Sequence, residues 1–199
     1  MKKSELRIIP ALAALCLHAS PATVARYSGS RIFWDARQPV TIFDGGGYGR
    51  LTELSDGRLM ACCESGGIKV SFSTNQGRTW SSPVVIAANQ TGTPNCAPDL
   101  AELSDGTILV CYNPRPQAPY TEDRRFGIRL RRSINGGKTW SKEIYVYDAD
   151  YTFENGCWEP SLLELPDGEL QLYFADESPY TTSSEQQISM CRSLDRGLT

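Results

Sequence analysis

STNQGRTW, at residues 73–80, recurs as SINGGKTW at residues 133–140 and as SLDRGLT at residues 193–199, so the copies begin 60 residues apart. In each copy a serine and, two positions later, an Asn or Asp can hydrogen-bond the turn backbone. The glycine two residues further on supplies the unusual φ that such a turn needs. The tryptophan can bury a large ring between neighbouring sheets. A turn of fixed chemistry at a fixed period indicates a repeat architecture.

A second repeat places an Asp-Gly pair after apolar residues. It reads LTELSDG at residues 51–57, LAELSDG at 100–106 and LLELPDG at 162–168. Asp-Gly between apolar runs is the strongest short hairpin pattern. Each unit therefore predicts strand, Asp-Gly turn, strand, loop, strand, eight-residue turn and strand, which is typical of a propeller blade. We predict an all-β propeller of which the chain covers about three blades, with Trp80 and Trp140 wedged beside the sheets and no helix longer than three turns after residue 40.

The first 25 residues have the pattern of a signal peptide. A basic start is followed by the apolar run from Ile8 to Leu17, and Thr23-Val24-Ala25 offers small residues for a signal peptidase. The run is too short to span a bilayer as a helix. We expect cleavage near Ala25 and secretion, extracellular or periplasmic, without stable membrane insertion; the alternative is a disordered or interfacial N-terminus. Residues 26–199 would then be the N-terminal part of one propeller domain that breaks off within its third blade.

Composition excludes several classes of function. The net charge is −3, of which residues 1–25 contribute +2 (three basic, one acidic), leaving −5 for the rest. An acidic chain is not expected to bind nucleic acid. The one histidine, His18, lies in the predicted signal peptide. Residues 26–199 can therefore hold no Ser-His-Asp triad, no Cys-His dyad and no histidine zinc site. Acid–base chemistry must use carboxylates, tyrosine, lysine or cysteine, and we expect no metal and no cofactor.

Six cysteines follow the predicted signal peptide. They are Cys62, Cys63, Cys96, Cys111, Cys157 and Cys191. Export would permit disulfides, but no C-x-x-C spacing occurs. The adjacent pair at 62 and 63 would point to opposite faces of a strand. Buried free thiols are the alternative.

The blade topology predicts where a site would lie. Because antiparallel strands alternate in direction, the Asp-Gly and eight-residue turns share one end of a blade. The entry to the first strand and the loop from the second to the third strand share the other end, around the central channel. We expect Arg50, Asp99 and Glu159 at equivalent entry positions there. Charged groups converging on a channel mouth indicate function; the alternative is that they pair with one another and tie the blades together.

Further candidates flank these entries. Tyr48 precedes Arg50, and Trp158 offers a flat apolar face for a sugar ring, with packing between blades as the alternative. The exits from the second strands add Glu64, residues 113–115, and Asp176 with Glu177. The loops at 114–126 and 177–187 are long and rich in Pro, Tyr and charge, as a specificity rim would be; plain solvated loops are the alternative.

Several motifs resemble those of known families. The eight-residue turns resemble the Asp boxes (BNR repeats) of the sialidase superfamily, a motif that non-catalytic sorting receptors and assembly factors also carry. The segments GCWEPSLL at 156–163, YFADE at 173–177 and EQQISM at 185–190 are similar to the exo-α-1,5-L-arabinanases of glycoside hydrolase family 93. The resemblance covers about residues 40–199. Gln186-Gln187 departs from the Gln-Asp that the family usually has.

The arabinanase resemblance implies a six-bladed, metal-independent, retaining exo-hydrolase with two catalytic glutamates. Glu159 takes the position of the first, as nucleophile or acid/base, and the second would lie beyond Thr199. Such a pair of carboxyls is about 5–5.5 Å apart. The substrate would be an oligosaccharide or polysaccharide. The predicted substrate-binding residues are Tyr48, Arg50, Asp99, Trp158, Asp176 and Glu177.

Two alternatives stay open. In the first, Tyr48-Gly49-Arg50-Leu51 resembles the arginine-bearing entry of an exo-α-sialidase, although Arg-Leu-Thr stands where Arg-Ile-Pro is usual. Arg50 would then be the first of three arginines that hold the substrate carboxylate. In the second, the chain is a non-catalytic glycan-binding or assembly propeller. A second glutamate, an arginine pair with a tyrosine, or neither, further along the chain would separate the three.

Overall fold

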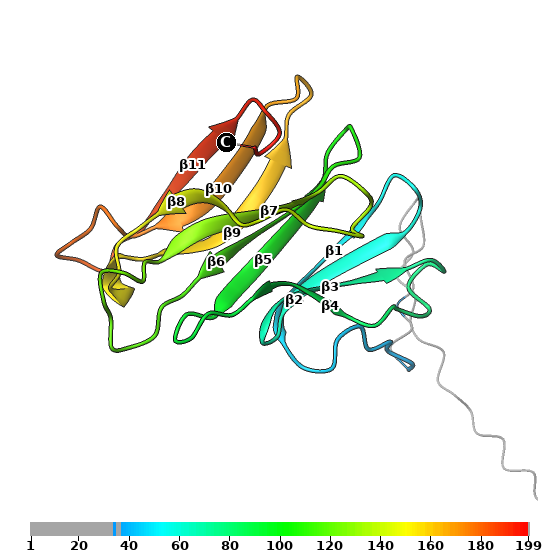
Figure 1. The fold of residues 1–199 in the computed structure, drawn as a ribbon, viewed down its shortest axis with the longest axis horizontal. Coiled ribbons are helices and arrows are strands. Elements are labelled where there is room, and N and C mark those ends of the chain that lie inside the picture. The colour runs from blue at the N-terminus through cyan, green and yellow to red at the C-terminus, as the bar shows by residue number, and fades with distance from the viewer. Residues whose placement is uncertain (1–33, 35–36, 199) are drawn as a thin grey trace, which may run out of the picture. The chain divides into compact units, whose positions relative to one another are not determined.

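The computed structural model describes residue 34 and residues 37–198. The predicted signal peptide, residues 1–25, lies outside the described residues. Val40–Thr199 forms one compact unit. In it, eleven strands make three antiparallel sheets (Figure 1). The described residues contain one helical element, the three-residue 3-10 turn η1 (Phe153–Asn155), so the prediction of an all-β structure is confirmed.

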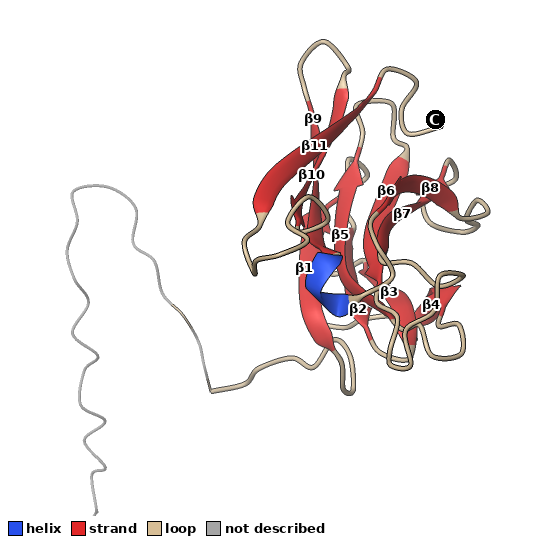
Figure 2. Ribbon diagram, turned by 90° about the vertical axis from the view of Figure 1, so that its left-hand side faces the viewer, coloured by secondary structure: helices blue, strands red, loops and turns tan. Residues whose placement is uncertain are grey.

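Each sheet follows chain order. The first contains β1 (Gly47–Glu53), β2 (Leu59–Glu64), β3 (Gly67–Ser73) and β4 (Val84–Ala88). The second contains β5 (Asn95–Glu102), β6 (Ile108–Pro114), β7 (Gly127–Ser133) and β8 (Ile144–Asp148). The third contains β9 (Cys157–Glu164), β10 (Leu170–Asp176) and β11 (Gln187–Ser193). The first strands β1, β5 and β9 lie beside one another (Figure 2). This is the arrangement of three propeller blades around a channel, as the repeats predict.

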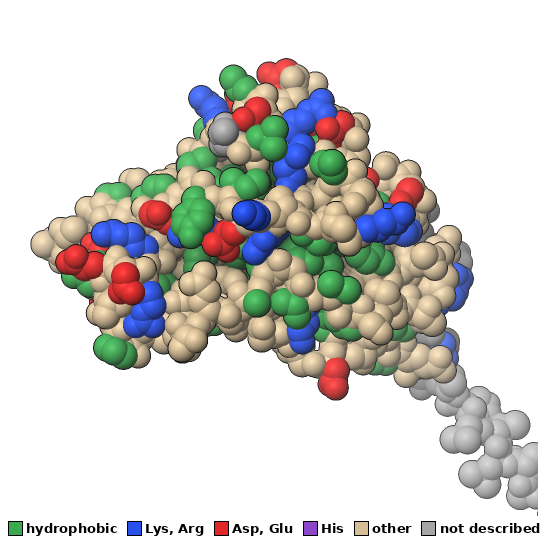
Figure 3. Space-filling view, in the orientation of Figure 1, with side chains coloured by type: hydrophobic (Ala, Val, Ile, Leu, Met, Phe, Trp, Pro, Cys, Tyr) green, Lys and Arg blue, Asp and Glu red, His purple; other side chains and the backbone are tan. Residues whose placement is uncertain are grey.

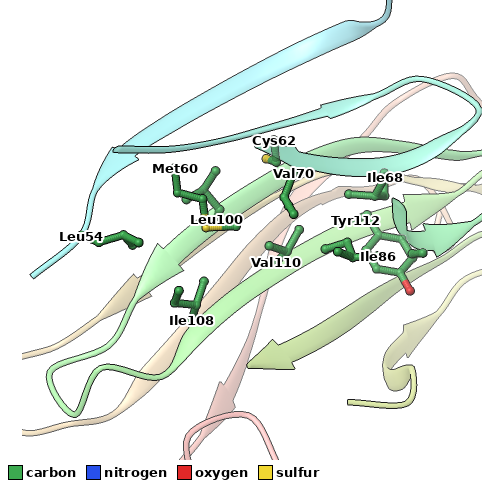
Figure 4. Packing of buried hydrophobic residues seen from close by; sticks show 11 residues of the cluster. Leu54, Met60, Cys62, Ile68, Val70, Ile86, Leu100, Ile108, Val110 and Tyr112 are labelled. Atoms are coloured by element: carbon green, nitrogen blue, oxygen red, sulfur yellow. The ribbon is translucent and has the colours of Figure 1, made fainter. Parts of the chain in front are cut away.

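The core consists of two apolar layers, one between each pair of neighbouring sheets. Strand β6 is buried along its whole length because its alternate side chains enter different layers. Val110 and Tyr112 pack with Met60 and Val70 between the first and second sheets (Figure 4), while Leu109 packs toward the third sheet. Trp140 covers the edge of the first layer, which confirms its predicted place between the sheets.

The eight-residue turns are closed by their own side chains. In the first, Ser73 Oγ accepts the amide of Gly77 (2.9 Å) and donates to Asn75 Oδ1 (3.0 Å), which also accepts the amide of Thr79 (2.9 Å). The indole N–H of Trp80 donates to the carbonyl of Gly77 (3.1 Å). The second and third copies repeat the Ser–Gly and Ser–Asn/Asp bonds. Serine and Asn/Asp recur because each satisfies backbone groups that the tight turn leaves without a ladder partner.

A glutamate–serine contact links each blade to the next at the Asp-Gly end. Glu102 Oε1 accepts the hydroxyl of Ser55 (3.0 Å), and Glu164 Oε1 accepts the hydroxyl of Ser104 (2.9 Å). In both pairs the other carboxylate oxygen accepts the serine amide. The third Asp-Gly turn has Pro166 at this position, which offers neither hydroxyl nor N–H.

The six cysteines of the described residues are all free. Cys62, Cys63, Cys111 and Cys157 are buried, and burial raises the pKa of each thiol. They act as small apolar core residues. Of the two alternatives that the cysteine pattern left open, the structure therefore shows the free thiols.

One face of the structure shows how the surface charges are distributed. On the face shown in Figure 3, basic and acidic side chains are interspersed and do not gather by sign. Within residues 37–198 no helix is long and apolar enough to cross a bilayer.

Candidate functional site at the channel mouth

Each inner strand begins with a β-bulge. The strand ladder passes from Gly47 directly to Arg50 in β1, and β5 and β9 skip two residues at the same place. The first skipped residue has a positive φ in all three strands: 49° at Tyr48, 45° at Ala97 and 55° at Glu159. Positive φ is uncommon for residues with side chains, and such strain gathers at functional sites. Tyr48, Ala97 and Glu159 are therefore structurally equivalent.

The predicted equivalence of Arg50, Asp99 and Glu159 is wrong in its third member. Arg50 and Asp99 follow the bulge, and their counterpart in β9 is Ser161, two residues beyond Glu159. The bulge is common to all three strands, so it does not move Glu159 relative to the other two; Glu159 stands two residues too early in the repeat. Counting back six residues from the aspartate of each Asp-Gly turn gives Arg50, Asp99 and Ser161, so the repeat spacing already contained the correct register.

The bulges bring Tyr48 and Glu159 together across the channel mouth. The Tyr48 hydroxyl donates to Glu159 Oε1 over 3.0 Å, and both side chains are exposed. Trp158 is half-buried, with its ring centre 5.2 Å from that of Phe126 and 5.0 Å from that of Phe153. These ring contacts hold Trp158 in place. The exposed carboxylate of Glu159 therefore lies next to an aromatic residue whose position is fixed.

Arg115 completes this cluster from the second sheet. Its guanidinium carbon lies 5.6 Å from the centre of the Tyr48 ring and 5.1 Å from that of Trp158, within the range of cation–π attraction. Its Nε donates to Asn113 Oδ1 (2.6 Å). Sequence reasoning placed Arg115 at the channel-mouth exit of its blade but gave it no role, since its partners come from the other two sheets.

Asp99 serves mainly to join blades, and Arg50 lies beside it. Arg50 Nε lies 3.9 Å from Asp99 Oδ1, and Asp99 Oδ2 accepts the amide of Leu162 in the third sheet (3.0 Å). Glu64 acts in the same way, because its Oε2 accepts the amide of Ala97 (2.6 Å). The alternative that these charges tie the blades together describes the Asp99 contacts, whereas the Arg50 side chain keeps 47% of its surface exposed.

Asp176 and Glu177 form hydrogen bonds with residues other than Tyr48 and Glu159. Asp176 is buried, and its oxygens accept the hydroxyls of Tyr147 (3.0 Å), Ser178 (2.6 Å) and Ser189 (3.1 Å). This network gives Asp176 a scaffold role in place of the predicted substrate contact. Glu177 Oε1 accepts the side-chain amide of Gln186 (2.9 Å), and Glu177 lines a cavity of about 510 Å³ on the loops of the third blade.

No protein-family model and no curated protein matches the chain. Solved structures do match. An α-L-arabinanase of Penicillium chrysogenum complexed with arabinobiose is 22% identical over 73% of this chain and 45% of its own, with a TM-score of 0.57. A mutant α-L-arabinofuranosidase of Fusarium graminearum in complex with an iminosugar inhibitor is 25% identical over 75% and 45%, with a TM-score of 0.59. A Hadza microbial sialidase is 17% identical over 76% and 36%, with a TM-score of 0.58.

These likenesses define the class of fold as a glycoside hydrolase-like β-propeller. The resemblance to arabinanase and sialidase propellers that the motifs indicate is thus confirmed for the fold. The chain spans less than half the length of each of these structures.

Proposed function

We propose that the chain is part of a retaining, exo-acting glycosidase in which Glu159 is a catalytic carboxylate, and that the sugar it releases is L-arabinose. The observation that carries the proposal is the hydrogen bond from Tyr48 to Glu159, made by two exposed side chains at strained backbone positions. Strain maintained at two facing positions is typical of a site whose geometry matters for chemistry.

Glu159 is the carboxylate of this cluster that the scaffold leaves accessible. Glu64 and Asp99 each accept a backbone amide from a neighbouring blade, whereas Glu159 is bonded, among the described residues, by Tyr48 alone. A retaining mechanism needs a second carboxyl about 5–5.5 Å away. We place this partner in a blade outside residues 40–198.

We assign Glu159 the role of nucleophile. A nucleophilic carboxylate must be oriented toward the anomeric carbon that it attacks, and a hydrogen-bond donor to one of its oxygens fixes that orientation. Tyr48 supplies that donor at 3.0 Å. Trp158, the next residue before Glu159, offers its ring as a platform for a sugar. The substrate class follows the Penicillium arabinanase, which is complexed with arabinobiose.

Glu159→Gln in the full-length protein tests the assignment. The amide is nearly isosteric, so the fold should persist while arabinose release from linear arabinan falls by several orders of magnitude. Glu154→Gln, at an exposed glutamate on η1, is the matched control and should keep full activity. Full activity of Glu159→Gln would refute the proposal.

Azide separates the two catalytic roles. With Glu159→Ala and azide, a nucleophile variant should yield a glycosyl azide of inverted anomeric configuration, because azide attacks directly from the vacated face. Loss of the acid/base instead gives the retained anomer, by attack on the covalent intermediate. The retained product would therefore move Glu159 to the acid/base role.

The sialidase alternative is less well supported by the geometry. Arg50 would have to bind a substrate carboxylate while it lies against Asp99 at 3.9 Å. Release of sialic acid from a sialoside, with no arabinose release, would favour it. A full-length protein that binds arabinan oligosaccharides without cleaving them would favour the non-catalytic alternative.

A further inference from the structure

A cavity of about 410 Å³ is lined by residues of the β6–β7 loop and by Phe153 of η1. It is connected to the Tyr48–Glu159 pair through Arg115, which lines it and lies against the Tyr48 ring. Figure 1 shows where the β6–β7 loop runs, at one end of the sheets. The volume of the cavity lies within the range of about 300–1,000 Å³ that is usual for small-molecule sites. Its lining includes Cys96, Arg115, Tyr120, Phe126 and Phe153. Three of them are aromatic, and Phe126 and Phe153 both pack against Trp158, the neighbour of Glu159.

The cavity wall carries a cation whose charge is not neutralised. Within residues 37–198 no carboxylate forms an ion pair with Arg115. Its Nη2 is buried and has no hydrogen-bond acceptor among those residues. The Cys96 thiol is no counter-charge, because burial and the nearby Glu64 carboxylate raise its pKa to about 11, against the effect of Arg115. A partly buried guanidinium without a carboxylate is unfavourable unless a ligand supplies one.

The contacts of Arg115 involve its Nε atom and the aromatic rings beside it. The Nε atom donates to Asn113 Oδ1, and the guanidinium carbon lies within cation–π distance of the rings of Tyr48 and Trp158. The Nη end is the part that these contacts do not use. A carboxylate that meets this end can accept two parallel N–H bonds, the arrangement for which arginine is best suited.

We propose that this cavity is a subsite for an acidic sugar residue, a uronic acid, whose carboxylate binds Arg115 and whose ring packs against Tyr120 and Phe153. The identification of the ligand as a sugar rests on the proposed glycosidase function; the need for a carboxylate rests on Arg115 alone. The substrate would then carry an acidic residue next to the sugar that the site at Glu159 releases.

Direct binding tests this subsite without turnover. The probes are methyl β-D-glucuronide, methyl β-D-glucoside and sodium acetate, titrated into the full-length protein and followed by calorimetry. Wild type should bind the glucuronide at least about tenfold more tightly than the glucoside, the factor expected for a charge-assisted pair of hydrogen bonds. Equal affinity for the glucoside would overturn the acidic ligand, and acetate as tight as the glucuronide would overturn the sugar.

Variants at Arg115 and Tyr120, with a control at Arg78, locate the binding. Arg115→Met keeps the apolar stem and should lose the preference for the glucuronide, whereas Arg78→Met, at an exposed arginine of the first eight-residue turn, should keep it. If Arg115→Met does not fold, Arg115→Lys keeps the charge without the planar fork and should weaken glucuronide binding severalfold. Tyr120→Ala should weaken the glucuronide but leave acetate unchanged. Unchanged glucuronide affinity in whichever arginine variant folds would overturn the proposal.

Glu159→Gln distinguishes this proposal from the proposed function. It should abolish turnover and leave glucuronide binding unchanged, because the two groups lie in adjacent but separate sites. If wild type binds the glucuronide through Arg115 but hydrolyses no glycoside, the proposed function fails while the subsite stands.

Discussion

The hydroxyl of Tyr48 donates to Oε1 of Glu159 over 3.0 Å, although 111 residues separate the two in the chain. The bond connects the first blade to the third across the channel mouth. Both residues sit in the same bulge of equivalent strands, so the repeat itself creates the meeting point. The bulge residue is exposed in the first and third blades and is the buried Ala97 in the second, so the residue type at this position sets the chemistry of each blade.

Tyr48→Phe should lower kcat for the proposed hydrolysis about tenfold to a hundredfold with little change in KM. The variant removes one hydrogen bond to a charged group, which is worth about 1.5–3 kcal/mol. The ring that packs against Arg115 is kept. Steady-state kinetics on arabinan oligosaccharides measure the effect. Tyr145→Phe is the control, at a tyrosine that is 65% exposed. Equal kcat in wild type and Tyr48→Phe would show that the bond has no catalytic role.

Much of the fold could be predicted because its decisive chemistry is local. The eight-residue turn closes through bonds among Ser73, Asn75, Gly77 and Thr79, all within one short segment. The residue types and their spacing in the sequence are therefore enough to predict these hydrogen bonds. The same holds for the Asp-Gly turns, where Asp56 Oδ1 accepts the amide of Arg58 two residues later (3.0 Å).

The site could be predicted only in part because its contacts are long-range. The motif predicts Glu159 as a site residue, but its hydrogen bond with Tyr48 depends on how the first blade packs beside the third, which no local pattern contains. Arg115 acquires its role only where rings from two other sheets meet it. Asp176 is a charged residue at the end of a strand, as a site residue would be, but two of the three hydroxyls that bond it, those of Tyr147 and Ser189, come from other strands.

Ser73→Ala should destabilise the chain by about 1–3 kcal/mol. The hydroxyl is buried, and its loss leaves the amide of Gly77 and the Oδ1 of Asn75 each short of one bond. Urea unfolding followed by tryptophan fluorescence gives the free energy of unfolding. Thr74→Ala, at an exposed position of the same turn, is the control and should change stability by less than about 0.5 kcal/mol. Similar values for the two variants would show that the serine bonds add nothing.

Ser104→Ala should reveal the coupling between the second and third blades. The variant loses the hydroxyl bond to Glu164 Oε1 but keeps the amide bond to Oε2, so we expect a loss of about 0.5–1.5 kcal/mol. A double-mutant cycle with Glu164→Gln isolates the pair. Ser82→Ala, at an exposed serine, is the control. A coupling energy of zero in the cycle would mean that the blades are held by their apolar layers alone.

The free energy of unfolding should fall between about pH 9 and pH 11, and titration of the Cys96 thiol should cause part of that fall. Its thiol has a pKa of about 11 in the folded chain, against an ordinary value of 9.0, because burial disfavours the thiolate. Below pH 9 both states keep the proton and the full stabilisation is present. As the pH rises toward 11, the unfolded chain releases the proton while the folded chain retains it, which favours unfolding.

Cys96→Ala removes this titration and should flatten the curve over that range relative to wild type. Thermal unfolding at closely spaced pH values measures the difference between the two proteins, and the other cysteines cancel because both carry them. Alkylation gives an independent readout, since only the thiolate reacts: Cys96 in the folded protein should be modified slowly at pH 8 and rapidly near pH 11. Parallel stability curves, together with fast alkylation at pH 8, would contradict the raised pKa and with it the neutral thiol beside Arg115.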